Sequence, residues 1–361
     1  MRARSRVLAV LSGLLLTVSL ASVPALGAGA RPAPVGQDPI TAGQRYSGDF
    51  PDPAVLRVGL NYYAFSTTSY GLNVPALTST DLKSWRAVHG TSANPTGDAL
   101  PRTPVWSDGV EQKDGRYRAT TWAPTVTRIG PGRYVLAYAT RTKAPNARMC
   151  ISIARSTSPA GPFVDSSTKP TVCPDRGAID PQIFIAPTGR PFLLWKKDHY
   201  PAQMFTIGLN ADGVTVTPGA KHFYLGGIAR DWEGKIIENP AMIRYKKRFY
   251  LFYSANSYAS SKYAVGYMIC KKWYRDCKRP KKGPFMKSGK YLSGPGGATP
   301  FVDAAGNLRL AYHAWRTGAV GYAKDAETCR STWLGCGQRR LYIATLGVKK
   351  NGTLKVVRWT T

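Results

Sequence analysis

The hydrophobic positions of this chain recur in pairs of short apolar segments, and each pair opens beside a proline. A turn and a second segment rich in aromatic side chains follow each proline-led segment. Short apolar runs bounded by turn residues predict β-strands, and proline is tolerated at the first residue of a strand. Five such pairs occur at near-equal intervals, led by Asp52-Pro53, Ala123-Pro124, Asp180-Pro181, Asn239-Pro240 and Thr299-Pro300.

A repeat made only of strands is typical of a β-propeller, in which each repeat forms one antiparallel blade around a common axis. No long helical periodicity appears after residue 30. Glycine and proline are frequent, with 36 and 27 residues, as many short strands and turns require. The sequence therefore predicts an all-β, five-bladed propeller as a single domain over residues 45–361, with the proline-led strand innermost in each blade.

The first 30 residues have the composition of a secretory signal. Three arginines precede an apolar stretch over Val7–Leu20, and residues 28–30 match a small-residue cleavage site. The apolar stretch is short for a transmembrane helix, and no later segment is apolar enough to span a bilayer. We therefore expect a signal peptide over residues 1–30, a linker over residues 31–44, and a secreted, extracellular protein without a membrane partner.

The six cysteines are an even number, which suits disulfides in an exported chain. The chain has no paired CxxC motif and no Cys/His cluster, so a zinc site is disfavoured. Sequence alone leaves the connectivity open. Pairing between neighbours is the simplest scheme, and it joins Cys150 with Cys173, Cys270 with Cys277, and Cys329 with Cys336.

The formal net charge is +30 at pH 7, a field that favours polyanionic partners. The densest basic run is Lys271–Lys290, where Asp276 is the sole acid. Two interpretations stay open for this run: a solvated loop that keeps the protein soluble, or a docking surface for an acidic cell-wall polymer such as pectin. No nucleic-acid recognition motif accompanies the charge, so nucleic acid is not an expected partner.

Three acids stand beside the prolines of the predicted repeats: Asp52, Asp180 and Glu238. An Asp before a proline is commonly a turn residue. Equivalent positions of a propeller, however, face one axial channel, where a carboxylate is costly unless it is paired or functional. The sequence therefore predicts that three acids far apart in the chain meet in one pocket.

Carboxylates on both sides of a sugar can hydrolyse a glycosidic bond. One must hold a proton for the leaving oxygen, and the other must be ionised to activate water or to attack the sugar. A third acid can raise the pKa of the proton donor by like-charge repulsion. Phe50, Trp122 and Trp315 near the same positions suit the apolar face of a sugar ring, and packing between blades explains each of them equally well.

His313 lies in the second strand of the fifth repeat. A histidine in a strand is more often a hydrogen-bonded core residue, but one that faces the channel could hold a substrate, a water or an ion. The other histidines show no metal-ligand spacing. Because the chain also lacks a GxSxG elbow, a P-loop, a dinucleotide fingerprint and an HExxH motif, serine-hydrolase, nucleotide and zinc-protease functions have no support.

The order of these motifs resembles glycoside hydrolase family 43, the five-bladed propeller enzymes that act on arabinan, arabinoxylan and xylan. The resemblance covers about residues 45–345, nearly the whole predicted mature chain. It rests on six motifs in the family's order: Phe50-Pro51-Asp52-Pro53, Ser79–Trp85, Trp122-Ala123-Pro124, Ser156–Phe163, Ile179-Asp180-Pro181 and Tyr312-His313-Ala314-Trp315.

The resemblance implies an inverting glycoside hydrolase, of the arabinanase, arabinofuranosidase or β-xylosidase type. It implies that Asp52 is the general base, that Glu238 is the general acid, and that Asp180 tunes and orients the acid. Plant polysaccharides or oligosaccharides with α-L-arabinofuranosyl or β-D-xylosyl linkages are then the expected substrates. Phe50, Trp122, His313 and Trp315 are the expected substrate-binding residues.

His313 also matches a histidine that lies near a central cation in some family members, so Ca²⁺ or another cation is a candidate ligand, and no other cofactor is expected. A monomer is expected. Asn239 departs from the family, which usually has Glu-Gly-Pro where this chain has Glu-Asn-Pro. Two alternatives stay open: retention of configuration, as in related enzymes that act on fructans, and a non-catalytic carbohydrate-binding propeller.

Overall fold

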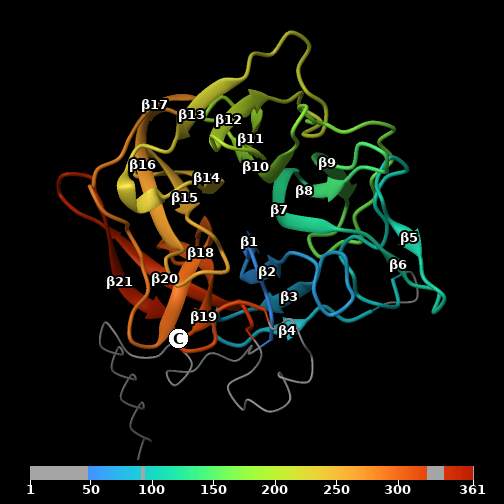
Figure 1. Cartoon of the computed structure of the whole chain (residues 1–361), viewed down its shortest axis with the longest axis horizontal. Coiled ribbons are helices and arrows are strands. Elements are labelled where there is room, and N and C mark those ends of the chain that lie inside the picture. Colours follow the sequence, from blue (N-terminus) through green and yellow to red (C-terminus); the bar gives the residue numbers. More distant parts are fainter. Residues whose placement is uncertain (1–47, 91–93, 323–336, 361) are drawn as a thin grey trace, which may run out of the picture. The chain divides into compact units, whose positions relative to one another are not determined.

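The strands form sheets around a common axis in the computed structural model (Figure 1), which describes residues 48–90, 94–322 and 337–360. The predicted signal peptide, the predicted linker and the pair Cys329 and Cys336 lie outside these residues. Helical structure in the described residues is limited to the single turn η1 (Asp231–Glu233). Within the same ranges, no helix is long and apolar enough to cross a membrane.

Five antiparallel meanders make the blades, which confirms the predicted fold. The first blade has β1 (Ala54–Val58), β2 (Asn61–Phe65), β3 (Ala76–Ser79) and β4 (Arg86–Ala87). The hairpin β5 (Val110–Glu111) and β6 (Tyr117–Arg118) precedes the second blade, which has β7 (Thr121–Gly130), β8 (Arg133–Arg141) and β9 (Met149–Ser156). The third blade has β10 (Ala178–Ile185), β11 (Pro191–Lys197), β12 (Gln203–Gly208) and β13 (Phe223–Gly227).

The fourth blade has β14 (Ile237–Tyr245), β15 (Arg248–Ala255), β16 (Ala264–Lys272) and β17 (Arg275–Lys278). The fifth has β18 (Leu292–Val302), β19 (Leu308–Arg316), β20 (Arg340–Val348) and β21 (Leu354–Thr360). The first strand of each blade contacts the first strands of both neighbouring blades, and β1 contacts β18 to close the ring. The innermost strands are therefore the proline-led ones, as the sequence predicts.

The hydrophobic core lies largely between adjacent blades. Aromatic side chains of neighbouring blades meet edge to face. Phe65 and Phe163, which lies in the loop after β9, are 6.3 Å apart, and Phe184 and Phe249 are 6.1 Å apart, between ring centroids. Burying a side chain of this size stabilises the fold by about 1.5–3 kcal/mol. The aromatic-rich strands of the sequence are thus the surfaces that hold the blades together.

Four of the five repeat prolines lie inside their strands rather than at the strand starts that the sequence predicted, and only Pro53 directly precedes its strand, β1. Pro124, Pro181 and Pro240 each follow a residue with positive φ, and the register of each strand shifts there. This pattern is a β-bulge, in which two residues face one residue of the partner strand. Because a bulged residue is left out of the hydrogen-bond ladder, a proline costs no ladder bond at this position.

The fifth repeat is out of register with the sequence prediction. Its bulge lies between Gly296 and Thr299, so Gly297 and Ala298 occupy the place of the residue–proline pairs in other blades. Gly297 has a φ of 56°, and a Cβ there would lie 2.6 Å from the His313 ring and 2.7 Å from Asp52 Oδ1. Glycine is therefore required for these two side chains to approach each other.

Two predicted disulfides are confirmed: Cys150 with Cys173, and Cys270 with Cys277. The first bridge joins β9 to the loop that precedes β10. The second closes the hairpin between β16 and β17 at a paired position of the two strands. Both bridges link segments that are close in the sequence, as local pairing requires.

Asp98 anchors the loop between β2 and β3. Its carboxylate accepts the backbone N–H of Asn73 at 2.6 Å, of Val74 at 2.9 Å and of Leu100 at 3.0 Å, and its side chain is buried. The same loop carries Thr67 and Tyr70, which line the central pocket. Asp98 therefore fixes one wall of that pocket from behind.

Replacing Asp98 with Ala should leave three buried N–H groups without their acceptor. We expect the free energy of unfolding to fall by about 2–4 kcal/mol, because each unsatisfied buried donor carries a desolvation cost. Urea denaturation measures this change. Asp175→Ala at an exposed position is the control and should change the unfolding free energy by less than about 0.5 kcal/mol. Equal stability of the two variants would contradict the anchoring role.

Candidate active site

The inner strands converge on a pocket of about 720 Å³ that is lined by Asp52, Asp180 and Glu238 together. Asp52 immediately precedes the proline that leads into β1, Asp180 lies in β10, and Glu238 lies in β14. The electrostatic environment of Tyr263 includes all three carboxylates. The structure thus brings together the three acids that the sequence placed far apart.

The three acids are not at equivalent positions. Asp180 is the positive-φ residue of the bulge in β10, and Asp52 also has a positive φ, two residues before β1, with φ values of 56° and 52°. In β14 that place belongs to Asn239, with a φ of 55°, and Glu238 lies one residue earlier. The predicted equivalence of Glu238 is therefore wrong by one residue. Asn is among the few non-glycine residues that adopt positive φ readily, which explains how it stands where the family usually has Gly.

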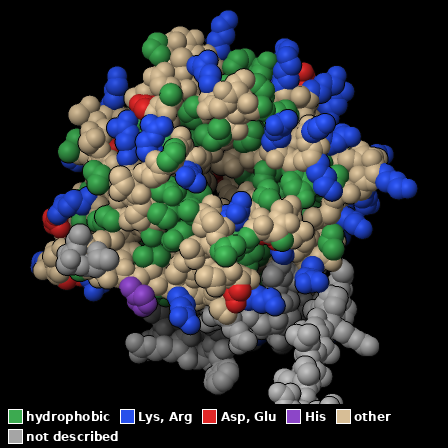
Figure 2. Space-filling model, turned by 180° about the vertical axis from the view of Figure 1, so that it is seen from behind, with side chains coloured by type: hydrophobic (Ala, Val, Ile, Leu, Met, Phe, Trp, Pro, Cys, Tyr) green, Lys and Arg blue, Asp and Glu red, His purple; other side chains and the backbone are tan. Residues whose placement is uncertain are grey.

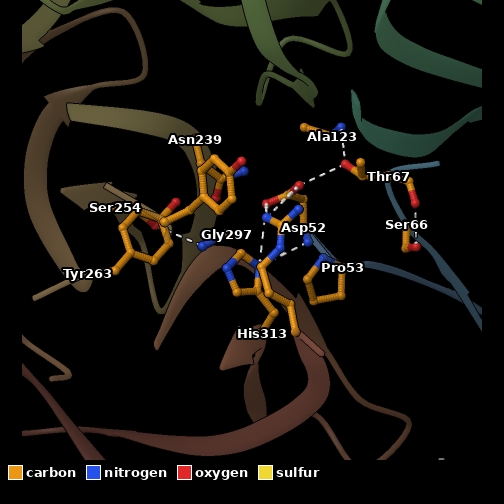
Figure 3. Close-up of polar contacts among 12 residues, drawn as sticks. Asp52, Pro53, Ser66, Thr67, Ala123, Asn239, Ser254, Tyr263, Gly297 and His313 are labelled. Atoms are coloured by element: carbon orange, nitrogen blue, oxygen red, sulfur yellow. Dashed lines mark hydrogen bonds and ion pairs between the residues drawn. The ribbon is translucent and has the colours of Figure 1, made fainter. Parts of the chain in front are cut away.

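Asp52 is surrounded by hydrogen-bond donors (Figure 3). Its Oδ2 accepts the hydroxyl of Thr67 at 2.7 Å, and Arg339 Nη1 lies 3.2 Å and 3.3 Å from its two oxygens. Thr67 in turn accepts the N–H of Ala123 at 2.8 Å, which ties the first blade to the second. Burial raises the pKa of Asp52, but the Arg339 charge and the Thr67 hydrogen bond outweigh it and hold the pKa below its usual range. Asp52 is therefore an ionised carboxylate at neutral pH.

The pKa of Asp180 is shifted in the opposite direction to that of Asp52. Burial and then the charge of Glu238 raise its pKa to about 8, and its Oδ2 accepts the N–H of Asn239 at 2.9 Å. Glu238 Oε1 accepts the hydroxyl of Tyr263 at 2.8 Å, and Lys196 Nζ lies 3.3 Å from Oε2. Like-charge repulsion between the two acids is present as predicted, but it raises the pKa of Asp180. One pocket thus holds an ionised acid and a protonated acid.

The second strands contribute a further set of polar residues, most of which the sequence analysis missed. Lys196 pairs with the residue before the bulge of its blade, and Ser254 and His313 do the same in theirs. In the first blade, Thr67 donates its N–H to the backbone oxygen of Pro51, the residue before Asp52. These residues could be found from the sequence only once the register of each bulge is known. Arg339 was missed because it reaches Asp52 from the far end of the chain.

The three aromatic residues that the sequence predicted as sugar contacts differ in whether they reach the pocket. Trp122 lines the pocket and is 40% exposed, so its ring is free to contact a ligand. Phe50 and Trp315 are fully buried and offer no face to the pocket, which corrects their expected role in direct substrate binding. Trp315 donates its indole N–H to the backbone oxygen of Tyr258 at 2.7 Å. Its contribution is to support a pocket loop.

Three tyrosines that the sequence analysis did not select line the same pocket as Trp122. Tyr70, Tyr258 and Tyr322 are each exposed, and Arg339 lies 4.6 Å from the ring centroid of Tyr258. Aromatic rings with one apolar face and a polar edge suit the faces of sugar rings. The pocket therefore combines carboxylates at its base with an aromatic lining.

His313 is fully buried, and its ring stacks on Tyr263 with centroids 5.7 Å apart. Its Nδ1 accepts the N–H of Asp52 at 3.0 Å, so the proton of the neutral ring lies on Nε2. Burial lowers its pKa to about 3, which keeps the ring neutral. A protonated nitrogen does not bind a cation, and no group of three or more metal-binding side chains occurs in residues 48–90, 94–322 and 337–360. His313 therefore supports Asp52 through Nδ1, while its buried Nε2 has no hydrogen-bond partner among the described residues.

Known proteins of one family resemble this chain. The model for the glycosyl hydrolases family 43 matches residues 46–334. Over 116 residues, the chain is 31% identical to the extracellular endo-alpha-(1->5)-L-arabinanase of Thermotoga petrophila, a match that covers 31% of this chain and 22% of that protein. The fold is similar to that of a thermostable family-43 glycoside hydrolase, with a TM-score of 0.68, 22% identity, and coverage of 87% of this chain and 94% of that one.

The fold is also similar to that of an endo-1,4-beta-xylanase from Bacteroides thetaiotaomicron, with a TM-score of 0.64, 22% identity, and coverage of 86% of this chain and 94% of that one. At these identities the likeness to both solved structures concerns the fold alone. The curated arabinanase and the xylanase differ in the polysaccharide that they are named for. The comparisons therefore agree on the architecture and leave the sugar to further argument.

The raised pKa of Asp180 predicts a cost in stability. The folded protein binds this proton more tightly than the unfolded chain, so stability falls as pH rises from about 4 towards 8. Asp180→Asn keeps an oxygen for the Asn239 N–H and removes the buried charge. We expect the variant to be more stable than the wild type by about 2–5 kcal/mol at pH 8 and nearly equal at pH 4, as measured by urea denaturation.

Asp175→Asn at the surface is the matched control for this experiment and should show no such dependence on pH. A stability difference between Asp180→Asn and the wild type that stays constant from pH 4 to pH 8 would contradict a raised pKa for Asp180.

Proposed function

The chain belongs to glycosyl hydrolases family 43 and is a glycoside hydrolase, and we propose that it hydrolyses arabinose-containing polysaccharides of the plant cell wall with inversion of configuration. The observation that carries this proposal is the pocket in which the pKa of Asp52 is held low while the pKa of the nearby Asp180 is raised. Hydrolysis of a glycosidic bond needs an ionised and a protonated carboxyl group in one site.

Asp52 is the general base in this proposal. It removes a proton from a water molecule as that water attacks the anomeric carbon of the sugar. Arg339 and Thr67 donate to its oxygens, so the carboxylate is oriented and stays ionised when substrate excludes water. The stacked pair of His313 and Tyr263 supports it from the fifth and fourth blades, because the His313 ring accepts the Asp52 N–H.

Glu238 is the general acid, which gives a proton to the leaving oxygen. Asp180 and Glu238 repel each other when both are ionised, and this repulsion contributes to the raised pKa of Asp180. The active form of the pair has the proton on Glu238 and the charge on Asp180. Lys196 and the N–H of Asn239 stabilise that charge, because Lys196 interacts with both acids and the N–H of Asn239 is bonded to Asp180.

The arabinan preference rests on the local similarity to a protein named as an arabinanase. The fold is also similar to that of a protein named as a xylanase, so β-D-xylosyl linkages are the second candidate. The exposed ring of Trp122 beside the carboxylates supports either sugar as a stacking surface. Two disulfides support an oxidising, extracellular location, which agrees with the predicted signal peptide.

A panel of substrates tests the proposal. Linear arabinan, arabinoxylan, nitrophenyl arabinofuranoside and nitrophenyl xyloside are incubated with the wild type, and the sizes of the products are measured. We expect arabinose or arabino-oligosaccharides to be released faster than xylose products. Faster release of xylose products would move the assignment to xylan. Binding of these polysaccharides without any release would instead support a non-catalytic carbohydrate-binding propeller.

The assigned roles predict the behaviour of two variants. Asp52→Asn and Glu238→Gln should each lower kcat by roughly 10²–10⁴-fold, because each removes one proton transfer. Both variants keep the shape of the pocket and should bind an oligosaccharide in calorimetry with nearly the affinity of the wild type. Glu111→Gln at an exposed position is the control and should retain full activity.

Proton NMR of the first sugar released by the wild type decides the stereochemistry. Inversion requires that the product has the anomeric configuration opposite to that of the substrate. A product that retains the configuration would overturn the inverting mechanism and make Asp52 a nucleophile.

A further inference from the structure

The face opposite the pocket has a strongly basic cluster on the fourth and fifth blades. Strands β14, β16 and β20 each begin beside a pocket residue, respectively Glu238, Tyr263 and Arg339. Their other ends therefore lie at the opposite face of the propeller. Three turns leave from those ends, and their cations are Lys246, Lys247 and Arg248 after β14, Lys272 and Arg275 after β16, and Lys349 and Lys350 after β20.

Contacts between the turns bring these cations together. A Cβ on Gly352 would lie 2.5 Å from Arg248 Cζ, so the Arg248 guanidinium packs directly on the turn after β20. Tyr250 also donates to the backbone oxygen of Gly352 at 2.9 Å. The ring of Phe249 lies 5.9 Å from that of Trp273 in the turn after β16. The turn after β14 therefore joins the other two into one surface.

Acidic side chains do little to neutralise this surface. Asp276 lies 3.7 Å from Arg275, and Asp303 in the neighbouring turn is bonded to Arg309 at 2.6 Å. Within residues 48–90, 94–322 and 337–360, no salt bridge involves Lys246, Lys247, Arg248, Lys349 or Lys350. The cations are exposed and share an excess of positive charge. Lys and Arg side chains also clearly outnumber Asp and Glu side chains on the face of the molecule that Figure 2 shows.

The backbone gives an independent reason to connect this surface with function. Lys246 and Lys247 have φ values of 45° and 65°, as in the hairpin turns that usually contain Asn-Gly. Such φ values cost roughly 1–2 kcal/mol for each residue with a Cβ. Lysine at both positions of this turn therefore lowers the local stability. Strained backbone positions of this kind are common at binding sites.

Aromatic rings lie among the charges. Lys272 and Arg275 lie 5.9 Å and 5.6 Å from the ring centroid of Tyr274, and Lys246 lies 5.8 Å from that of Tyr245. The disulfide between Cys270 and Cys277 fixes the hairpin that carries Tyr274. A rigid surface that offers both cations and partly exposed rings suits a sugar polymer that carries carboxylates, because the rings meet sugar faces while the cations meet the acids.

We propose that the three basic turns, defined as Lys246–Arg248, Lys272–Arg275 and Lys349–Gly352, bind a polyuronate chain on the face opposite the pocket. This inference rests on the proposed function, because acidic polymers accompany neutral polysaccharides in the plant cell wall. Binding there holds the enzyme on the wall and leaves the pocket free for neutral chains. The predicted basic run Lys271–Lys290 contributes only in part, since its Arg279 is bonded to the buried Glu233 at 2.6 Å.

Polygalacturonate is the probe for this site, and its methyl-esterified form is the neutral comparison. A variant of the full chain removes four cations from the turns: Lys246→Gln, Lys247→Gln, Lys349→Gln and Lys350→Gln. A matched control removes four exposed lysines from the first two blades and the loops beside them: Lys83→Gln, Lys113→Gln, Lys143→Gln and Lys169→Gln. Both variants have the same net charge, so only the location of the charge differs.

We expect the turn variant to lose about tenfold or more of its affinity for polygalacturonate in dilute salt, and the control to lose less than about twofold. Binding should weaken steeply with salt and should be absent for the esterified polymer. Equal losses in the two variants would overturn the site in favour of diffuse attraction by net charge. Tighter binding of duplex DNA or polyphosphate by the same turns would overturn the polyuronate in favour of a phosphate polymer.

Hydrolysis of nitrophenyl arabinofuranoside and nitrophenyl xyloside, measured in parallel, separates this inference from the proposed function. Both variants should retain the rate of the wild type, because neither touches the pocket. A wild type that hydrolyses no glycoside but binds polygalacturonate through the turns would contradict the proposed function alone. A wild type that hydrolyses one of the glycosides but binds polygalacturonate no better than the esterified polymer would contradict the basic surface alone.

Discussion

The β-bulge near the start of the inner strands is the constraint on which both the fold and the pocket depend. Four inner strands have this bulge, which places a residue with positive φ in the strand and, in three of them, lets a proline follow without loss of a ladder bond. In the first blade, Asp52 has the positive φ and Pro53 leads into β1. In two blades that residue is an aspartate of the pocket, Asp52 or Asp180. In the fifth blade it is Gly297, whose lack of a side chain leaves room for His313 and Asp52. A repeated backbone geometry thus carries different residue types in different blades, and two of them are pocket aspartates.

The sequence predicted the number of blades because prolines and aromatic-rich strands repeat with the fold. It did not predict the register, because a bulge changes the count of residues on one strand and leaves no fixed signature in the chain. Glu238 was therefore taken as equivalent to Asp180, although Asn239 holds that position. The fifth bulge has Ala298 where a proline was expected, so the nearest proline, Pro300, was chosen in its place.

The cations that pair with these acids could not be predicted from the sequence, for a different reason. Arg339 reaches Asp52 across 287 positions of the chain, and Lys196 reaches Glu238 across 42. Neither cation lies in a motif, and in a chain with 50 Lys and Arg residues a functional cation does not stand out. The acids could be selected because only 20 Asp and Glu residues occur and because three of them lie one or two residues before the prolines of the predicted repeats. The acids could be identified in the sequence because they are few, whereas Arg339 and Lys196 could not be distinguished from the many other cations.

The pocket and the basic turns lie on opposite faces of the propeller, and they differ in whether their cations are paired with acids. In the pocket, each cation is paired with an acid. Arg339 forms an ion pair with Asp52, and Lys196 forms one with Glu238 and also interacts with Asp180. At the basic turns, the lysines have no such partners among the described residues, so their charge is available to a ligand. Because the core lies between blades, the turns at either end of a strand can change without disturbing the packing that holds the sheet. The strand β14 shows this separation directly, since it carries the acid Glu238 near one end and leads into the Lys246–Arg248 turn at the other.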